Sequence, residues 1–157
     1  MTKELSIQDV ADWFIDNGND ITPKKLQKML YYAYAWALVF FNDDQKDLRT
    51  KLFDGNFEAW VHGPVNRKIY AEYRDYGYGV INPESKSDEQ AISDDVLDLL
   101  KQINEIYGPY NGNELERLTH SESPWINARG DAKPLDSSTN KLSDEDMFDF
   151  YGKKLIA

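Results

Sequence analysis

The chain has 157 residues, no cysteine and a formal net charge of -10. This length fits one ordinary domain, and the missing cysteines exclude disulfides, thiolate catalysis, zinc–cysteine sites and iron–sulfur clusters. The acidic charge argues against nucleic-acid binding, which draws much of its affinity from neutralised phosphates, and favours a basic partner. The N-terminus lacks the features of a signal peptide, and the longest apolar tract, residues 33–41, is too short to span a bilayer. We therefore expect a cytoplasmic protein with no membrane segment.

Two helices are predicted near the N-terminus. The first covers about residues 6–17, because Ser6 and Asp9 have the spacing of a capping box and Gly18 can end a helix. The second covers about residues 22–41, where an N-cap threonine is followed by proline. Apolar side chains occupy most sides of this second helix, which is typical of a helix buried in the middle of a domain.

The middle of the chain predicts a strand, a break and a helix. Apolar and polar residues alternate at the end of the stretch 53–61, which permits a short strand. Gly63 and Pro64 are then expected to break the chain. A helix is predicted to follow over residues 65–76, with Gly77 as its stop.

The second half of the chain predicts further helices. Apolar residues recur at helical spacing, and in the longest of these segments Leu99, Ile103 and Ile106 are expected to face the core. The predicted helices cover about residues 93–107, 112–119, 124–128 and 143–151. The sequence therefore predicts a mainly α fold: a single compact multi-helix domain over residues 1–157, with at most a small β element near residues 52–61.

The two histidines, His62 and His120, are the candidates for chemistry. Together with a carboxylate they could ligate zinc or transfer protons, so a small hydrolase or metal-dependent enzyme using both is the alternative function. No metal motif marks a third ligand, and no nucleophile elbow, phosphate loop or dinucleotide fingerprint occurs. Both histidines precede turns beside helix starts, where an imidazole can hydrogen-bond the backbone. We expect structural roles for both, and no cofactor.

Lysine and tyrosine suggest two surfaces. Lys24, Lys25 and Lys28 are expected on the solvent side of the second helix. A transcriptional regulator, a third alternative, would need a basic helix that faces a DNA groove, which a chain of this charge does not favour. Tyr70 and Tyr73 are three residues apart and share a helix face. Tyrosines on such a face either line the core or contact a partner protein, and the sequence leaves both roles open.

Three blocks of sequence, in order and with matching spacing, resemble one family. Residues 21–34 read ITPKKLQKMLYYAY, close to a capped helix with the pattern K-L-Q-K-L-L-Y-Y-A. Residues 57–65 read FEAWVHGPV, close to F-x-A-W-x-x-G-P-V, and Tyr70 and Tyr73 follow. Residues 118–129 read LTHSESPWINAR, close to L-[ST]-H-x-x-x-P-W-x-x-A-R. The chain thus resembles the Panacea domain, a phage-associated family.

The resemblance implies a mainly α fold and a place in toxin–antitoxin pairs of prophages or mobile elements. Members of this family act as antitoxins that bind toxins directly, and one branch delivers its toxin to a protease. The partner would then be a toxin encoded by the neighbouring gene, while the oligomeric state stays open. The resemblance implies no catalytic residue. The motif residues carry over only as a partner-binding surface or scaffold: Trp60, His62, Gly63, Pro64, Tyr70, Tyr73, Thr119, His120 and Trp125.

Overall fold

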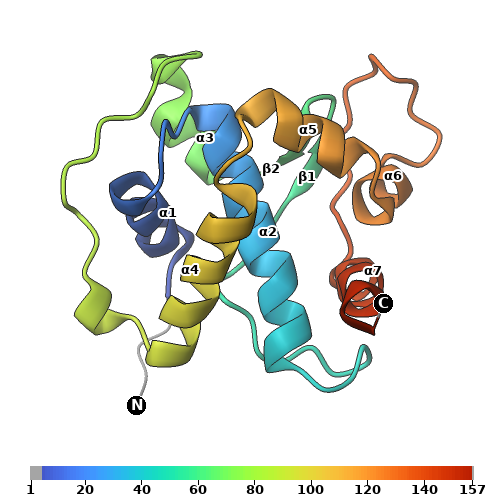
Figure 1. Ribbon diagram of the computed structural model, residues 1–157. Helices are drawn as coiled ribbons and strands as arrows, with labels where there is room; N and C mark the ends of the chain where they lie inside the picture. The colour runs from blue at the N-terminus through green and yellow to red at the C-terminus, as the bar shows by residue number, and fades with distance from the viewer. Residues whose placement is uncertain (1–4, 157) are drawn as a thin grey trace.

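One long helix, α2 (Pro23–Phe41), forms the centre of the structure, and the other elements surround it (Figure 1). The computed structural model describes residues 5–156. In this part of the chain there are seven α-helices and one two-stranded sheet, which confirms the predicted mainly α fold. The remaining elements are α1 (Ile7–Asn17), β1 (Glu58–Trp60), β2 (Gly63–Val65), α3 (Arg67–Tyr73), the 3₁₀ turns η1 (Arg74–Tyr76) and η2 (Glu89–Ala91), α4 (Asp94–Tyr107), α5 (Gly112–His120), α6 (Ser123–Arg129) and α7 (Asp144–Ile156).

Helix α2 is buried on nearly every side, as its composition predicts. Thr22 caps its start by accepting a hydrogen bond from the backbone N–H of Lys25 (3.2 Å), and Pro23 occupies the first turn, where a missing N–H costs nothing. Every residue from Lys25 to Ala35 is buried. Helices α1, α4, α5 and α7 and strand β2 all pack directly against it. Within residues 5–156, no helix combines the length and the apolar character needed to cross a membrane.

The predicted starts of α1 and α4 are confirmed by their caps. Ser6 and Asp9 form a reciprocal capping box, with N···O distances of 3.1 Å and 3.0 Å. Ser93 caps α4 through the backbone N–H of Val96. Each cap satisfies backbone donors that the first turn of a helix leaves free. The sequence therefore fixes where these outer helices begin.

Two details of the outer helices differ from the prediction. Helix α7 continues to Ile156 instead of ending near residue 151. Its added turn carries an ion pair between Asp149 and Lys153 (3.1 Å), whose spacing of four residues supports a helix. In α4, the inward stripe follows Leu99 and Ile103, as predicted, and then ends on Tyr107. Ile106 lies beside that stripe and is 58% exposed, so its predicted place in the core is wrong.

The stretch around Gly63 also differs from the prediction. Strands β1 and β2 form an antiparallel hairpin in which Trp60 lies opposite Gly63. Gly63 and Pro64 therefore belong to a second strand and do not break the chain before a helix. The following helix is shorter than predicted, because α3 begins at Arg67, after the N-cap residue Asn66, and gives way to the 3₁₀ turn η1 after residue 73. The predicted small β element is present, and it includes this second strand.

The hairpin accommodates a proline because of its register. Pro64 lies opposite Ala59. The Ala59 N–H donates to the carbonyl oxygen of Asn140 (2.8 Å), and the Ala59 carbonyl oxygen accepts from Arg129 Nη1 (3.2 Å). Since the polar groups of Ala59 point away from β2, this is a position without ladder hydrogen bonds, and the missing N–H of Pro64 costs nothing. The chain near residue 140 also covers the outer edge of β1.

A buried polar network surrounds the carboxylate of Glu122. Glu122, which is 4% exposed, accepts hydrogen bonds from the hydroxyls of Tyr32 (2.7 Å) and Tyr151 (2.8 Å). The Tyr31 hydroxyl lies 3.0 Å from that of Tyr151, and the Tyr107 ring stacks on Tyr32 with 4.0 Å between centroids. Burial raises the pKa of Glu122 and the pKa of Tyr32, because it disfavours the charged form of each side chain. The network joins α2, α4, α6 and α7.

Removing one donor from this network is expected to destabilise the fold. Tyr32→Phe and Tyr151→Phe each leave the buried Glu122 with one hydrogen bond fewer, at an expected cost of about 1–3 kcal/mol in the free energy of unfolding. Urea unfolding at neutral pH measures this cost. Tyr110→Phe is the control, because Tyr110 is 43% exposed and its change is expected to stay within about 0.5 kcal/mol. Equal losses for all three variants would contradict a special role for the Glu122 network.

Candidate functional site

Residues from all three motif blocks meet around the side chain of Lys28. Lys28 is 1% exposed, and its Nζ lies 3.5 Å from the carbonyl oxygen of Pro64 in β2. Gly63 of β2 lies against both Lys28 and Thr119 of α5. The predicted solvent positions of Lys28 and Lys25 are therefore wrong. Both side chains are buried, because neighbouring elements cover this part of α2.

The approach of β2 to α2 depends on glycine at position 63. Gly63 has φ +108°, a backbone conformation that favours glycine. A Cβ atom at this position would lie 2.7 Å from Cε of Lys28 and 3.0 Å from Oγ1 of Thr119. Any other residue would therefore have to displace the end of the Lys28 side chain or move the hairpin away from α2 and α5.

Glu116 of α5 supplies a negative charge close to Lys24, Lys28 and His62. Its carboxylate accepts from Lys24 Nζ (2.7 Å) and lies 3.2 Å from Nδ1 of His62. Partial burial raises the pKa of Glu116, but the hydrogen bonds from Lys24 and His62 outweigh it and hold the pKa below its usual value. Burial lowers the pKa of Lys28 to about 7, although attraction to Glu116 opposes that shift. Lys28 is therefore poised between its charged and neutral forms near neutral pH.

His120 and Trp125 fasten α5 and α6 to the hairpin. Their rings stack with 4.0 Å between centroids. Trp125 Nε1 donates to the carbonyl oxygen of Trp60 (2.9 Å), and the Arg129 guanidinium lies 5.3 Å from the centroid of the Trp125 ring. Burial lowers the pKa of His120, while attraction to Glu116 opposes that shift. His120 is therefore stacked on a residue that is itself bonded to the hairpin.

The contacts around Lys28 and Glu116 hold neighbouring elements of the structure together. His62 and His120 lie at the same corner, since both interact electrostatically with Glu116. The Glu116 carboxylate, which interacts with both, is already shared with Lys24. Across residues 5–156 no group of three or more His, Cys, Asp or Glu side chains is arranged to hold a metal ion. The contacts hold the hairpin, α2 and α5 together, and Lys28 is buried beneath the hairpin.

The exposed motif residues form a separate feature on the outside of the hairpin. The rings of Trp60 and Tyr70 lie 5.0 Å apart, and Tyr70 is 44% exposed. Glu58 accepts from Trp60 Nε1 (2.9 Å) and from Arg67 Nε (2.8 Å), which fixes the indole in place. The His62 side chain, on the turn, is 68% exposed. We call the exposed and half-buried motif residues the hairpin surface: Trp60, His62, Tyr70, His120 and Trp125.

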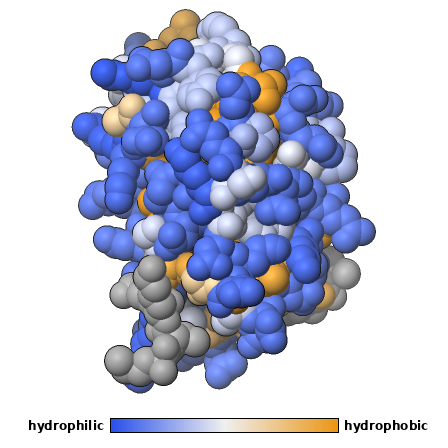
Figure 2. Space-filling view, turned by 90° about the vertical axis from the view of Figure 1, so that its left-hand side faces the viewer, coloured by the Kyte–Doolittle hydropathy of each residue, from blue (hydrophilic) through white to orange (hydrophobic). Residues whose placement is uncertain are grey.

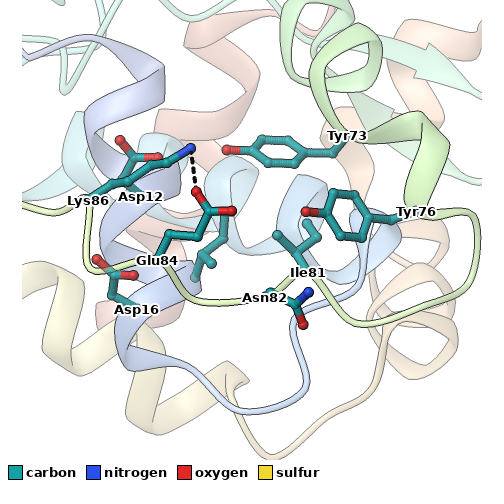
Figure 3. A pocket seen from close by; sticks show the side chains of 9 residues that line it. Asp12, Asp16, Tyr73, Tyr76, Ile81, Asn82, Glu84 and Lys86 are labelled. Atoms are coloured by element: carbon teal, nitrogen blue, oxygen red, sulfur yellow. Dashed lines mark ion pairs between the residues drawn. The ribbon is translucent and has the colours of Figure 1, made fainter.

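The other motif residues are buried, and one of them, Tyr73, contacts α1. Gly63 and Pro64 of β2 and Thr119 of α5 are buried where the hairpin meets α2 and α5. Tyr73 points toward α1, where its hydroxyl accepts from Gln8 Nε2 (2.7 Å), and it lines a small polar pocket (Figure 3). The pocket holds only about 30 Å³, far below the several hundred Å³ of a typical ligand site. Tyr73 therefore joins α3 to α1.

The acidic groups of that pocket also have structural roles. Asp16 accepts hydrogen bonds from the backbone N–H groups of Ser85 (3.1 Å) and Ser87 (2.8 Å). Glu84 and Lys86 form an ion pair across it (3.0 Å), as Figure 3 shows. The pocket therefore fastens the long connection before α4 onto α1.

Comparison with known proteins identifies the family. The antitoxin SocA-like Panacea domain matches residues 26–126, which is more than half of the chain. The chain belongs to this family. No curated protein and no solved structure matches the chain. The matched range contains Lys28, the hairpin and Glu116. The contacts that hold the hairpin against α2 and α5 therefore lie within the Panacea domain.

Sequence reasoning found most residues of this corner but missed Lys28 and Glu116. A signal for Glu116 was present, because Glu116, Thr119 and His120 are spaced to share one face of α5. A signal for Lys28 was also present. Apolar residues lie on most sides of α2, so a lysine in the middle of this helix has no solvent-exposed face to occupy.

The lowered pKa of Lys28 predicts a pH dependence of stability. The unfolded amine titrates near pH 10.5, whereas the folded amine titrates near pH 7. Between these values the unfolded state binds more protons, so the free energy of unfolding should rise with pH, by at most about 1.4 kcal/mol per pH unit. Comparing Lys28→Met with the parent Panacea domain by urea unfolding from pH 7 to 9 isolates this contribution. We expect the variant to lose most of the rise.

Lys101→Met is the matched control for that experiment, because Lys101 is exposed on α4. Its pH dependence should equal that of the parent protein. A Lys28→Met variant with the same slope as the parent would show that Lys28 keeps its ordinary pKa and is hydrated.

Gly63→Ala tests the close approach of the hairpin. The new Cβ meets Lys28 and Thr119 in a backbone conformation with positive φ, so an added loss of about 1–3 kcal/mol is expected from overpacking. Gly77→Ala provides the control, because Gly77 also has positive φ (+57°) but nothing lies within 4 Å of its added Cβ. Thermal and urea unfolding should show a larger loss for Gly63→Ala. Equal losses would mean that the backbone conformation alone is responsible.

Proposed function

We propose that this protein is an antitoxin that neutralises a cognate toxin by binding it directly in the cytoplasm. Membership of the antitoxin SocA-like Panacea family carries this proposal. The role is one of binding and not of catalysis: Lys24 and His62 both pair with Glu116, and Lys28 donates to the backbone of the hairpin, so these groups hold α2, α5 and the hairpin together. The toxin is the product of the neighbouring gene.

The hairpin surface is the first place where we expect the toxin to bind. Trp60 and Tyr70 present adjacent aromatic rings on elements that are held firmly from beneath, and rigid aromatic side chains dominate many binding hot spots. By contrast, the face formed by α1 and residues 77–93, at the left in Figure 1, is mainly hydrophilic with small, separate apolar areas (Figure 2). The buried motif residues support the surface from within.

The charge of the protein favours the same kind of partner. A net charge of -10 would attract a basic protein at a distance and accelerate their association at low salt. Toxins that act on nucleic acids carry basic surfaces for their targets. A complex with such a toxin would neutralise part of both surfaces.

Co-expression with the neighbouring open reading frame tests the function. We expect the neighbour to arrest growth alone, to be tolerated with this protein, and to co-purify with it. Trp60→Ala combined with Tyr70→Ala should weaken capture about tenfold or more, because two adjacent aromatic rings are lost. Tyr78→Ala is the matched control, since Tyr78 is 95% exposed and lies outside the hairpin surface. Thermal unfolding of each variant confirms that the fold is kept.

The outcomes separate several possibilities. A neighbour that is harmless alone and does not co-purify contradicts the antitoxin function. Capture that survives the double substitution removes the hairpin surface from the interface but keeps the function. Proteolytic delivery, the finer role of one family branch, predicts that toxin abundance falls when this protein is present and recovers when the host protease is deleted. Stable toxin in a stable complex would exclude that role.

A further inference from the structure

A groove at the C-terminal end of α2 has features that the contacts around Lys28 do not explain. It has a volume of about 320 Å³, enough for a few side chains, and lies between the end of α2 and the first turns of α4. In Figure 1 this half of α2 runs between α4 and α7. We call this groove between α2 and α4 the acidic groove. Its lining residues are Phe40, Phe41, Asp95, Asp98, Leu99 and Gln102.

The floor of the acidic groove is aromatic and exposed. Phe40 is 49% exposed, and its ring stacks on Trp36 with 5.7 Å between centroids. Trp36 is held in turn, because its Nε1 donates to the Tyr107 hydroxyl (2.9 Å) and its ring packs on Tyr151. Ile106, one turn beyond Gln102 on α4, adds a further exposed apolar side chain. A firmly held apolar surface is therefore presented to solvent at this place.

The rim of the acidic groove carries two aspartates, Asp95 and Asp98. In the part of the chain that the structure describes, neither Asp95 nor Asp98 forms an ion pair, and Asp98 accepts only from Gln102 Nε2 (3.1 Å). The last turn of α2 contains no basic residue, and within residues 5–156 only the neutral side chain of Asn42 donates to its carbonyl oxygens (Leu38, 3.0 Å), so the negative end of the helix dipole has no cationic partner on α2 itself. Asp43 and Asp44 follow in the next loop and are exposed. All of these features favour a cation.

Helix capping accounts for only part of this pattern. Asp95 lies in the first turn of α4, where a carboxylate stabilises the helix N-terminus. Asp98 lies beyond that first turn, and neither helix stability nor core packing requires a half-exposed Phe40. The combination of an apolar floor with unpaired carboxylates matches one face of a basic amphipathic helix, whose leucine-like side chains and arginines would meet Phe40 and the aspartates together.

We propose that the acidic groove is a docking site for a basic amphipathic segment of a partner protein. An apolar side chain of that segment packs on Phe40, and its Arg or Lys side chains pair with Asp95 and Asp98. The identity of the partner rests on the proposed function: the segment belongs to the toxin. The acidic groove then provides a second contact beside the hairpin surface.

A peptide assay tests the groove without the toxin. The probe is a fluorescein-labelled helical peptide with leucine at i, i+3, i+4 and i+7 and arginine on the flanking positions. The parent protein should bind it at low salt and more weakly at high salt, and should not bind a counterpart in which glutamate replaces arginine. Asp95→Lys with Asp98→Lys should weaken binding about tenfold or more, and Phe40→Ser should also weaken it.

The matched control changes the same charge elsewhere. Glu72→Lys with Asp75→Lys alters two exposed acidic residues at the end of α3 and in η1, and should keep affinity within about twofold of the parent. Equal losses for both charge reversals, or no binding by the parent, would overturn the proposal, because attraction would then follow net charge alone. A parent dimer that Phe40→Ser dissociates would also overturn it, since a second copy would fill the groove.

The toxin assay separates this proposal from the function it rests on. Toxin capture that Asp95→Lys with Asp98→Lys leaves unchanged would overturn the assignment of the groove to the toxin. Failure of the neighbouring gene product to co-purify with the parent contradicts the antitoxin function alone, and the peptide assay still decides the chemistry of the groove.

Discussion

The structure depends on the burial of α2 on nearly every side. A helix in that position must satisfy its polar side chains internally, because an unpaired buried polar group costs free energy. Gln27 does so by exchanging two hydrogen bonds with the backbone of Asn66 (2.9 Å and 3.0 Å). Lys25 donates to the carbonyl oxygen of Gly108 (2.7 Å), and Tyr34 donates to Asp144 (2.9 Å). Each polar residue of α2 therefore fixes the position of a different neighbouring segment.

This arrangement explains why the motif residues divide into two groups. Lys28, Gly63 and Thr119 lie in the interior and set the distance between α2, the hairpin and α5. Trp60 and Tyr70 lie outside, on elements whose positions that interior fixes. A partner that binds the outer rings meets a surface whose geometry is already set, so little conformational entropy is lost on binding. The buried motif residues can thus contribute to recognition without touching the partner.

Much of the fold could be predicted from local patterns. The caps at Ser6, Thr22 and Ser93 and the apolar periodicity of α2 specify their helices within a few residues. The hairpin could not be predicted, because Gly63 and Pro64 are ordinarily breakers. Their place in a strand depends on Ala59 bonding to distant residues such as Asn140. Long-range pairing of this kind leaves no periodic signal in either segment.

The burial of Lys28 illustrates the same limit for the site. Local reasoning assigns a lysine on an amphipathic helix to solvent, since a buried amine loses hydration. Here α5 and the hairpin enclose it, and Glu116 supplies a nearby charge from a helix almost ninety positions later in the chain. Phe40 shows the opposite case, because an apolar residue of the same helix remains half exposed beyond the last covering element. Which residues of α2 are covered is therefore decided by where its neighbours end, and the acidic groove begins at the place where that covering stops.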